Sequence, residues 1–506
     1  MKNVLAFAFV LLSLTIIAQK KTANPRPFAA TITEADLKRH MLIIAGGEME
    51  GRETATEGQR KAAAYIEAQF KSLNLIPGNQ GSYQLNYPVY KDSLITARMN
   101  INGASLAPGY DFQASTFFSS DHHLYFSELV YAGYGVADSL YNSYDKGNIS
   151  GKAVLVVESG PSGLKGGTGR NSPIGTIAKV NNARERGAAA VFTVSANFMP
   201  NTTAGRMYLS LFRDTQYSAT YLISDKTAEL MVGPAWSSMK EKLKTEKPEL
   251  QTFKKEIEVS YERKLQKLSS SNVLGVIEGT DKKDEYLVIT AHYDHLGKHD
   301  NVIYYGANDD GSGTVSVIEI AEAFAKAKTA GKGPRRSIIF MAISGEEKGL
   351  WGSQYYAMHP TVNPEKISAN LNIDMTGRID LDRKQPDSLN YVYIVGDDKL
   401  SSESKPLSEA VNKKYMKLGL DYKFNDPKDP QRIYYRSDHY NFAKIGVPII
   451  FYTDGATRPD YHKSTDTPDK INYPLMTKRA QLVFYTAWEI ANREDQLKRD
   501  IPLPKQ

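Results

Sequence analysis

Residues 286–290 read Tyr-Leu-Val-Ile-Thr, and this short apolar run, which leads directly into Ala291 and His292, decides the fold. Four similar runs follow it, separated by segments with helical spacing, at 337–343, 370–373, 391–395 and 447–452. Near-continuous apolar strands between helices indicate a sheet that is buried on both faces. From about residue 270 onward, the sequence therefore predicts an α/β fold, a doubly wound mixed sheet sandwiched by helices.

The composition is that of a globular protein with more than one domain. The chain has 506 residues, of which 41% are hydrophobic and 24% charged, and its formal net charge is +6. This length predicts two or three domains, and the composition excludes a wholly disordered, collagen-like or polytopic membrane chain. The weak and dispersed positive charge argues against nucleic acid as a partner. The chain has no cysteine, which excludes disulfides and thiolate metal ligands.

The N-terminus has the pattern of a secretory signal peptide. Lys2 precedes an apolar run from Val4 to Ala18, and polar Gln19 follows. The run is shorter than the ~20 residues that a membrane-spanning helix needs, which favours a cleaved signal over a membrane anchor. We therefore expect residues 1–18 to be removed and the protein to be exported, either periplasmic or extracellular, with no stable membrane anchor.

The remaining chain divides into three parts. Residues 19–119 are expected to form the N-terminal part of a main domain, with helical segments followed by short strands and turns from 83 to 118. Residues 120–262 are β-rich and include a helix that ends at Gly187 before another strand. Because they contain no catalytic constellation, we interpret them as an accessory module inserted into the main domain, which resumes over residues 263–506.

Residue types that can bind metal ions stand just after several of the predicted strands. In open α/β sheets, ligands bind outside the carboxyl ends of the strands, so these residues are expected to converge. One more acidic residue opens the helix between the first two strands, within the glycine-rich stretch 306–313. The complete set is His292, Asp294, Asp309, Glu346, Glu347, Asp374, Tyr461 and His462.

Taken singly, each of these residues has an ordinary structural explanation, such as a helix N-terminus for Asp309 or a solvated turn for the glutamate pair. The stretch 306–313 lacks the Gly-Lys-Ser/Thr of a phosphate loop. An EF-hand register with Gly311 at the sixth position places Gly306 and Val317 where carboxylates belong. Together, however, two histidines, two aspartates and two adjacent glutamates match the needs of two metal ions. One glutamate could bind metal while its neighbour moves a proton.

Five motifs resemble those of the co-catalytic di-zinc exopeptidases, a family that includes bacterial leucine-type aminopeptidases and glutamate carboxypeptidases. They occur in the family's order: Ala-His-Tyr-Asp-His-Leu-Gly at 291–297, Gly-Ala-Asn-Asp-Asp-Gly-Ser-Gly at 306–313, Ser-Gly-Glu-Glu-Lys-Gly-Leu-Trp-Gly-Ser at 344–353, Asn-Ile-Asp-Met at 372–375, and Tyr-His-Lys-Ser-Thr-Asp-Thr-Pro-Asp-Lys-Ile at 461–471. Residues 120–262 resemble a protease-associated domain, through Ala-Gly-Tyr-Gly at 132–135, Gly-Lys-Ala-Val-Leu at 151–155 and Ala-Arg-Glu-Arg-Gly-Ala at 183–188.

The resemblance implies a role for each residue of the set. His292 and Asp374 would hold one zinc ion, Glu347 and His462 would hold a second, and Asp309 would bridge the two. Glu346 would be the general base, Asp294 would orient His292, and Tyr461 would help to stabilise the oxyanion. We read the segment 436–440, Arg-Ser-Asp-His-Tyr, as pocket wall.

The function implied is that of an exported di-zinc aminopeptidase that hydrolyses the N-terminal residue from a peptide substrate. A water molecule that bridges the metals would attack, and Glu346 would take its proton. Three alternatives remain open at this point. They are a carboxypeptidase or dipeptidase of the same family, a glutaminyl cyclase-like enzyme with one zinc, and a receptor-like binding protein without metal.

Overall fold

The structure is a computed structural model that describes residues 23–114, 121–145, 147–164, 172, 174–195, 197–200, 207–209, 218–385 and 390–504. The expected signal peptide, residues 1–18, lies outside this part of the chain. Among the described residues, none of the helices has the length and apolar character that a membrane crossing requires.

The chain folds into two compact units, one made of the residues up to Tyr87 and from Ser270 onward, and one made of Pro88–Ser269. The expected module, 120–262, lies inside the second unit, but this unit begins earlier and includes residues 88–119. The physical reason is packing, because Met99 and Phe112 belong to the same hydrophobic core as the module's own strands.

The first unit is built on a mixed sheet with the strand order β17-β16-β18-β15-β11-β14-β10. The strands β14, β11, β15 and β18 are parallel, whereas β10 runs antiparallel to β14, and β16 runs antiparallel to β18 but parallel to β17. The strand bounds are β1 Ile76–Pro77, β10 Gln251–Ile277, β11 Lys282–His292, β12 Gly297–His299, β13 Val302–Tyr304, β14 Arg336–Ile343, β15 Ile367–Ile373, β16 Tyr391–Val395, β17 Gly419–Asp421 and β18 Ile449–Thr453. The predicted mixed α/β sheet is confirmed.

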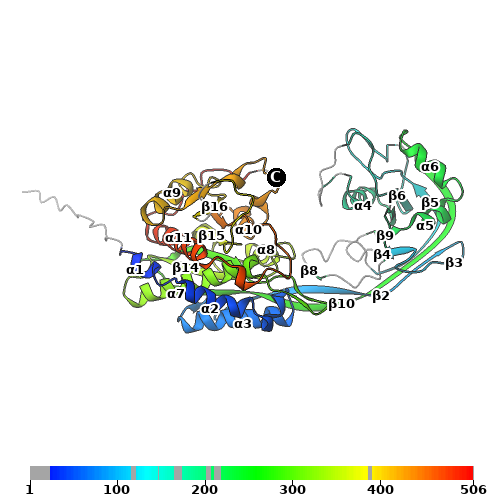
Figure 1. The fold of residues 1–506 in the computed structure, drawn as a ribbon. Helices are drawn as coiled ribbons and strands as arrows, with labels where there is room; N and C mark the ends of the chain where they lie inside the picture. The colour runs from blue at the N-terminus through cyan, green and yellow to red at the C-terminus, as the bar shows by residue number, and fades with distance from the viewer. Residues whose placement is uncertain are drawn as a thin grey trace, which may run out of the picture. The chain divides into compact units, whose positions relative to one another are not determined.

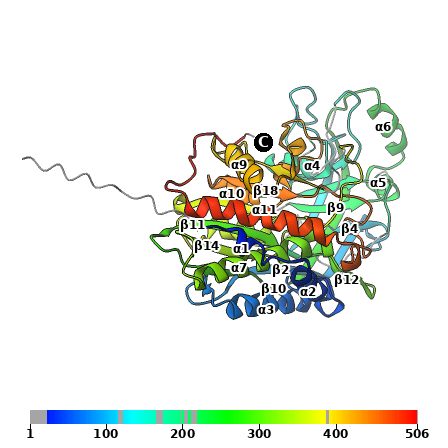
Figure 2. The ribbon, with the colours of Figure 1, turned by 60° about the vertical axis from the view of Figure 1, so that its left-hand side comes forward.

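Helices cover both faces of this sheet. Alternate residues of a strand point to opposite faces, so Phe340 of β14 joins the core under α2, α3, α7 and α11, while Met341 joins the core under α8 and α10. Figures 1 and 2 show α7 and α11 side by side along the strands. The helix bounds are α1 Arg26–Ala29, α2 Glu34–Ile44, α3 Glu57–Ser72, α7 Ser312–Thr329, α8 Trp351–Met358, α9 Ser404–Tyr415, α10 His439–Lys444 and α11 Tyr473–Asn492. Short turns are η1 Gly47–Arg52, η2 Ala307–Gly311, η3 Pro364–Lys366, η4 Lys423–Asn425, η5 Ile433–Tyr435 and η6 Pro468–Lys470.

Local sequence signals explain where the main helices begin. The side chain of Thr33 accepts the N–H of Asp36 at the start of α2, and the side chain of Asn472 accepts the N–H of Leu475 at the start of α11. Helix α7 is buried over most of its circumference because it lies between the sheet and the helices α2 and α11. This packing fixes the position of the first residues of α7, which follow Asp309 in the sequence.

The second unit is β-rich, as predicted, and its described residues also form the helices α4, α5 and α6. Its sheet has the order β10-β5-β6-β7-β9-β4, in which β5, β6, β7 and β9 are parallel. Its elements are β2 Gln84–Ile101, β3 Ala104–Ser105, β4 Phe112–Ala114, β5 His122–Tyr131, β6 Ala153–Val157, α4 Thr176–Glu185, β7 Ala190–Val194, β8 Met207–Leu209, β9 Ala219–Ile223, α5 Asp225–Val232 and α6 Trp236–Leu243. The expectation of short strands from residue 83 is wrong for β2, which is one long strand because it pairs with the equally continuous β10.

Candidate metal centre

The predicted site residues come together in the first unit, at the carboxyl edge of the parallel strands. His292 is the last residue of β11, the two glutamates follow β14, and Asp374 follows β15. Asp309 lies in the turn η2 ahead of α7, and His462 lies in the loop between β18 and α11. Because parallel strands end at the same edge, residues far apart in the sequence meet there.

Asp309 stands between the two histidines. Its Oδ1 lies 3.2 Å from Nε2 of His292, and its Oδ2 lies 3.1 Å from Nε2 of His462. On the two outer sides, Asp374 Oδ1 is 3.6 Å from His292 Nε2, and Glu347 Oε2 is 3.0 Å from His462 Nε2. One carboxylate thus faces two separate groups of ligand atoms.

Several of these atoms are buried and make no well-aligned hydrogen bond, although a side chain of the cluster lies within 3.2 Å of each. They include Nε2 of His292, Oδ2 of Asp309 and Oε1 of Glu347. Buried polar atoms are nearly always satisfied in native structures, so such a cluster calls for a further partner. Imidazole nitrogens with carboxylate oxygens are the ligands of zinc. The donor set therefore fits metal ions.

The two adjacent glutamates have opposite pKa shifts. Burial raises the pKa of Glu346 well above its ordinary value, and the charges of Glu347 and Asp374 act in the same direction. Burial also raises the pKa of Glu347, but hydrogen bonds from His295 and His462 outweigh this, and its pKa is lowered. Glu347 is therefore the ionised carboxylate, whereas Glu346 holds a proton more tightly.

Asp294 lies behind His292, on the side of its Nδ1. Nδ1 of His292 is 3.1 Å from the backbone carbonyl of Asp294 and 3.7 Å from its carboxylate. The carboxylate itself accepts hydrogen bonds from the hydroxyl of Thr54, at 2.7 Å, and from the backbone N–H of Glu346, at 3.2 Å. Asp294 thereby connects the histidine at the end of β11 with the loop that follows β14.

His295 is a member of the cluster that sequence reasoning missed. Its side chain is fully buried, and its Nδ1 lies 2.7 Å from Oε1 of Glu347. Ligand atoms of His295, Asp309 and Glu347 lie within 4.8 Å of one another, as do those of His292, Asp309 and Asp374. The sequence feature that could have revealed His295 is its position directly after Asp294 in the first of the five motifs.

Arg378 is a second residue that the sequence did not reveal. Its guanidinium donates to Oδ2 of Asp460, at 2.7 Å, and to Oδ1 of Asp466, at 2.5 Å. The other oxygen of Asp466 accepts the backbone N–H of Asp309, at 3.1 Å. Arg378 therefore connects the loop that carries His462 with the turn that carries Asp309.

Ser437 supports Asp374 in a similar way, because its hydroxyl donates to Oδ2 of Asp374 at 2.6 Å and accepts from Asn372 at 2.9 Å. The segment 436–440 thus does more than form pocket wall, since one of its residues contacts a candidate ligand directly.

A pocket of about 60 Å³ opens over the cluster. Asp309, Glu346 and Asp374 form its polar side, and Phe424, Ile433 and Phe451 form an apolar side. Tyr461 also lines it, with its ring stacked on that of His462 at 3.8 Å and its hydroxyl 3.1 Å from the guanidinium of Arg436. Burial raises the pKa of Tyr461, which keeps its hydroxyl protonated.

The sequence profile of peptidase family M28 matches residues 272–487, the stretch that carries all of the candidate ligands. This part of the chain thus matches peptidase family M28. The resemblance to zinc exopeptidases is thereby confirmed.

Curated relatives of this segment are named as peptidases. A probable zinc metalloprotease of Pyrenophora tritici-repentis is 31% identical over 214 residues, which cover 36% of this chain and 42% of the relative. A probable leucine aminopeptidase of Arthroderma otae is 28% identical over 230 residues, which cover 44% of this chain and 59% of the relative. The chain thus spans less than two thirds of the length of these relatives.

Two solved structures share the fold over nearly the whole chain. The aminopeptidase from Aneurinibacillus sp. strain AM-1 has a TM-score of 0.57 at 19% identity and covers 96% of this chain and 100% of its own. The zinc aminopeptidase BSAP from Bacillus subtilis has a TM-score of 0.51 at 18% identity and covers 93% of this chain and 99% of its own. These two proteins therefore share the fold of this chain over both the segment 272–487 and the second unit.

Proposed function

We propose that this chain is a zinc-dependent aminopeptidase that removes the N-terminal residue of peptides. The observation that carries the proposal is the position of Asp309, whose two oxygens face His292 on one side and His462 on the other. A carboxylate placed in this way is suited to bridge two ions. The family match and the names of the relatives support a peptidase.

The two ligand groups divide the proposed ions between them. His292 and Asp374 would hold one ion, Glu347 and His462 the other, and Asp309 would be shared. Zinc bound there would lower the pKa of a water molecule and polarise the substrate's carbonyl.

Glu346 is the proposed general base. It lines the pocket beside the cluster, and its Oε2 lies 3.9 Å from Nε2 of His292, farther than Oδ1 of Asp309, which lies at 3.2 Å. A carboxyl group with a raised pKa is closer to the operating pH, where proton transfer is most efficient. Glu346 would take a proton from the attacking water and deliver it to the leaving amine.

Tyr461 and Asp294 have supporting roles in this proposal. The protonated hydroxyl of Tyr461 would donate a hydrogen bond to the negative oxygen of the tetrahedral intermediate. Asp294 would keep Nε2 of His292 directed at the metal by contacting the other ring nitrogen.

The names of the relatives favour an aminopeptidase over a carboxypeptidase, since one of them is a probable leucine aminopeptidase. The apolar side of the pocket suits the first side chain of a peptide. Arg436 is one specific observation in favour of the second candidate, a dipeptidase, because its exposed guanidinium at the pocket could meet a substrate carboxylate.

We further propose that residues 1–18 direct export and that residues 120–262 are a protease-associated domain without chemistry of its own. None of the candidate ligands lies in that range. Deletion of the whole compact unit that contains this range, residues 88–269, should change the preference for substrate length while leaving the zinc content intact.

Three versions of one tripeptide, with both ends free, with an acetylated N-terminus and with an amidated C-terminus, test the direction of attack. An aminopeptidase cleaves the free and the amidated peptide at similar rates and leaves the acetylated peptide intact. Cleavage of the acetylated peptide would overturn the proposal, and failure on the amidated tripeptide alone would favour an enzyme that reads the C-terminus.

A further inference from the structure

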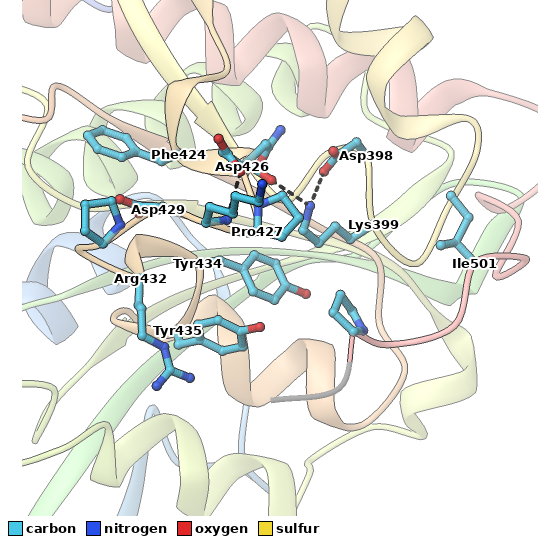
Figure 3. A pocket seen from close by; sticks show the side chains of 14 residues that line it. Asp398, Lys399, Phe424, Asp426, Pro427, Asp429, Arg432, Tyr434, Tyr435 and Ile501 are labelled. Carbon is cyan, nitrogen blue, oxygen red and sulfur yellow. Dashed lines mark hydrogen bonds and ion pairs between the residues drawn. The ribbon is translucent and has the colours of Figure 1, made fainter. Parts of the chain in front are cut away.

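Two pockets meet at Phe424. The first is the pocket of about 60 Å³ over the candidate metal centre, and the second has a volume of about 600 Å³. Figure 3 shows the second pocket, with Phe424 at one side and Tyr434, Tyr435 and Lys399 around it. Phe424 lines both pockets. A volume of 600 Å³ lies within the range of small-molecule sites.

The wall between the pockets is a single segment of the chain, residues 424–436. Ile433 and Arg436 line the pocket over the metal centre, whereas Arg432, Tyr434 and Tyr435 line the larger one. Neighbouring residues of the segment thus face different pockets. Phe424 is the residue of the segment whose side chain borders both.

Phe424 is held in place from several sides. Its side chain is 3% exposed, and its ring centroid lies 4.7 Å from that of Tyr393. A Cβ atom at Gly455 would come within 3.2 Å of the ring, so the backbone of the loop after β18 packs directly against it. The next residue, Asn425, accepts the N–H of Gly396 at 2.6 Å. The ring is a fixed partition.

We propose that Phe424 determines specificity by limiting the length of the substrate's first side chain. This inference rests on the proposed aminopeptidase function. With the partition in place, the first side chain has only the small apolar pocket, which admits compact residues such as leucine. Without it, a long side chain would pass into the larger pocket, whose tyrosines offer aromatic surface to an apolar or aromatic end group.

The test compares leucine 4-nitroanilide with the 4-nitroanilide of lysine whose side-chain amine carries a benzoyl group. The wild type should prefer leucine. Phe424→Ala should raise the ratio of kcat/KM for benzoyl-lysine to that for leucine by about tenfold or more. Phe424→Leu, which removes less of the ring and is the milder change for folding, should raise it by less.

Two control variants separate the partition from a general gain of space. Phe451→Ala removes the same atoms from the pocket over the metal centre without bordering the larger pocket, and it should shift the ratio less than Phe424→Ala does. Tyr435→Ala enlarges only the second pocket and should leave the ratio unchanged. A ratio within twofold of the wild type in folded Phe424→Ala and Phe424→Leu would overturn the proposal.

Affinity provides a readout that does not depend on turnover. Calorimetry with Nε-benzoyl-lysine and leucine as free ligands should show the same change in relative affinity in Phe424→Ala. Inactivity of the wild type on leucine 4-nitroanilide would refute the proposed function, and the affinity ratio alone would then decide the role of Phe424. An unchanged affinity ratio would refute the partition.

Discussion

Replacing Arg378 with methionine removes the link between the His462 loop and the turn that carries Asp309. The guanidinium side chain is 11% exposed, and its partners Asp460 and Asp466 are 8% and 2% exposed. Breaking a buried ion pair from one side typically costs ~3–5 kcal/mol, because a charge stays buried without its partner.

The structure places the effect below this range and directs it to metal binding. Lys470 still pairs with Asp460 at 2.8 Å after the change, and backbone N–H groups still donate to Asp466. Residues that support metal ligands typically contribute 10–100-fold to metal affinity. We therefore expect Arg378→Met to weaken zinc binding by ~10–100-fold, or about 1.4 to 2.8 kcal/mol.

The assay is a zinc titration against a chelating dye, together with thermal unfolding. Arg336→Met is the matched control, because Arg336 is also buried and paired, with Glu285 at 2.7 Å, but lies at the opposite end of β14. It should lower the melting temperature and leave the zinc affinity unchanged. Equal zinc affinity in Arg378→Met and wild type would refute the reasoning.

Three further predictions concern single side chains. Glu346→Gln should keep both zinc ions and lower kcat by ~10²–10⁴, whereas Glu347→Gln should lose zinc. Metal analysis and turnover measurements on both variants test this. The reverse pattern would exchange the roles of the two glutamates. His295→Asn keeps a nitrogen donor near the position of Nδ1 and should therefore retain more zinc than His295→Leu. Equilibrium dialysis measures the zinc content of both variants. Equal zinc loss in both would show that the donor to Glu347 does not contribute to zinc binding. Burial raises the pKa of Asp397 to about 7, so the folded state binds this proton more tightly than the unfolded chain, and the resulting stabilisation is complete below ~pH 4 and lost as the pH rises through 7. Asp397→Asn should therefore raise the melting temperature at pH 8 and not at pH 4. A difference in melting temperature that does not depend on pH, measured by calorimetry, would contradict this.

Much of the fold and site could be predicted from local patterns. The apolar runs at 286–290 and 337–343 lie within β11 and β14, and the metal-competent residues follow them in the sequence. Strand ends set the positions of His292 and Asp374, which is why spacing and residue type were sufficient to find them. Their assignment as ligands stays a prediction until an ion is observed.

The remaining features depend on contacts between distant segments. Arg378 reaches Asp460 and Asp466, more than 80 positions away, and no local pattern shows that these carboxylates turn toward it. The length of β2 follows from its pairing with the distant β10. The position of Phe424 between two pockets depends on a loop without regular strand or helix spacing.

The inserted unit illustrates the same limit. Its β-rich character and its helix that ends before Gly187 could be predicted from the sequence, because both depend on local sequence patterns. The inclusion of residues 88–119 could not be predicted. The apolar character of Met99 and Phe112 predicts burial but does not indicate which core they join.

The central claim is that Asp309 bridges two zinc ions, and anomalous X-ray diffraction at the zinc absorption edge tests it most directly. Crystals of the zinc-loaded protein should show two peaks, one contacted by His292 and Asp374 and the other by Glu347 and His462, with an oxygen of Asp309 at each. A single peak, or two peaks that Asp309 does not connect, would contradict the account.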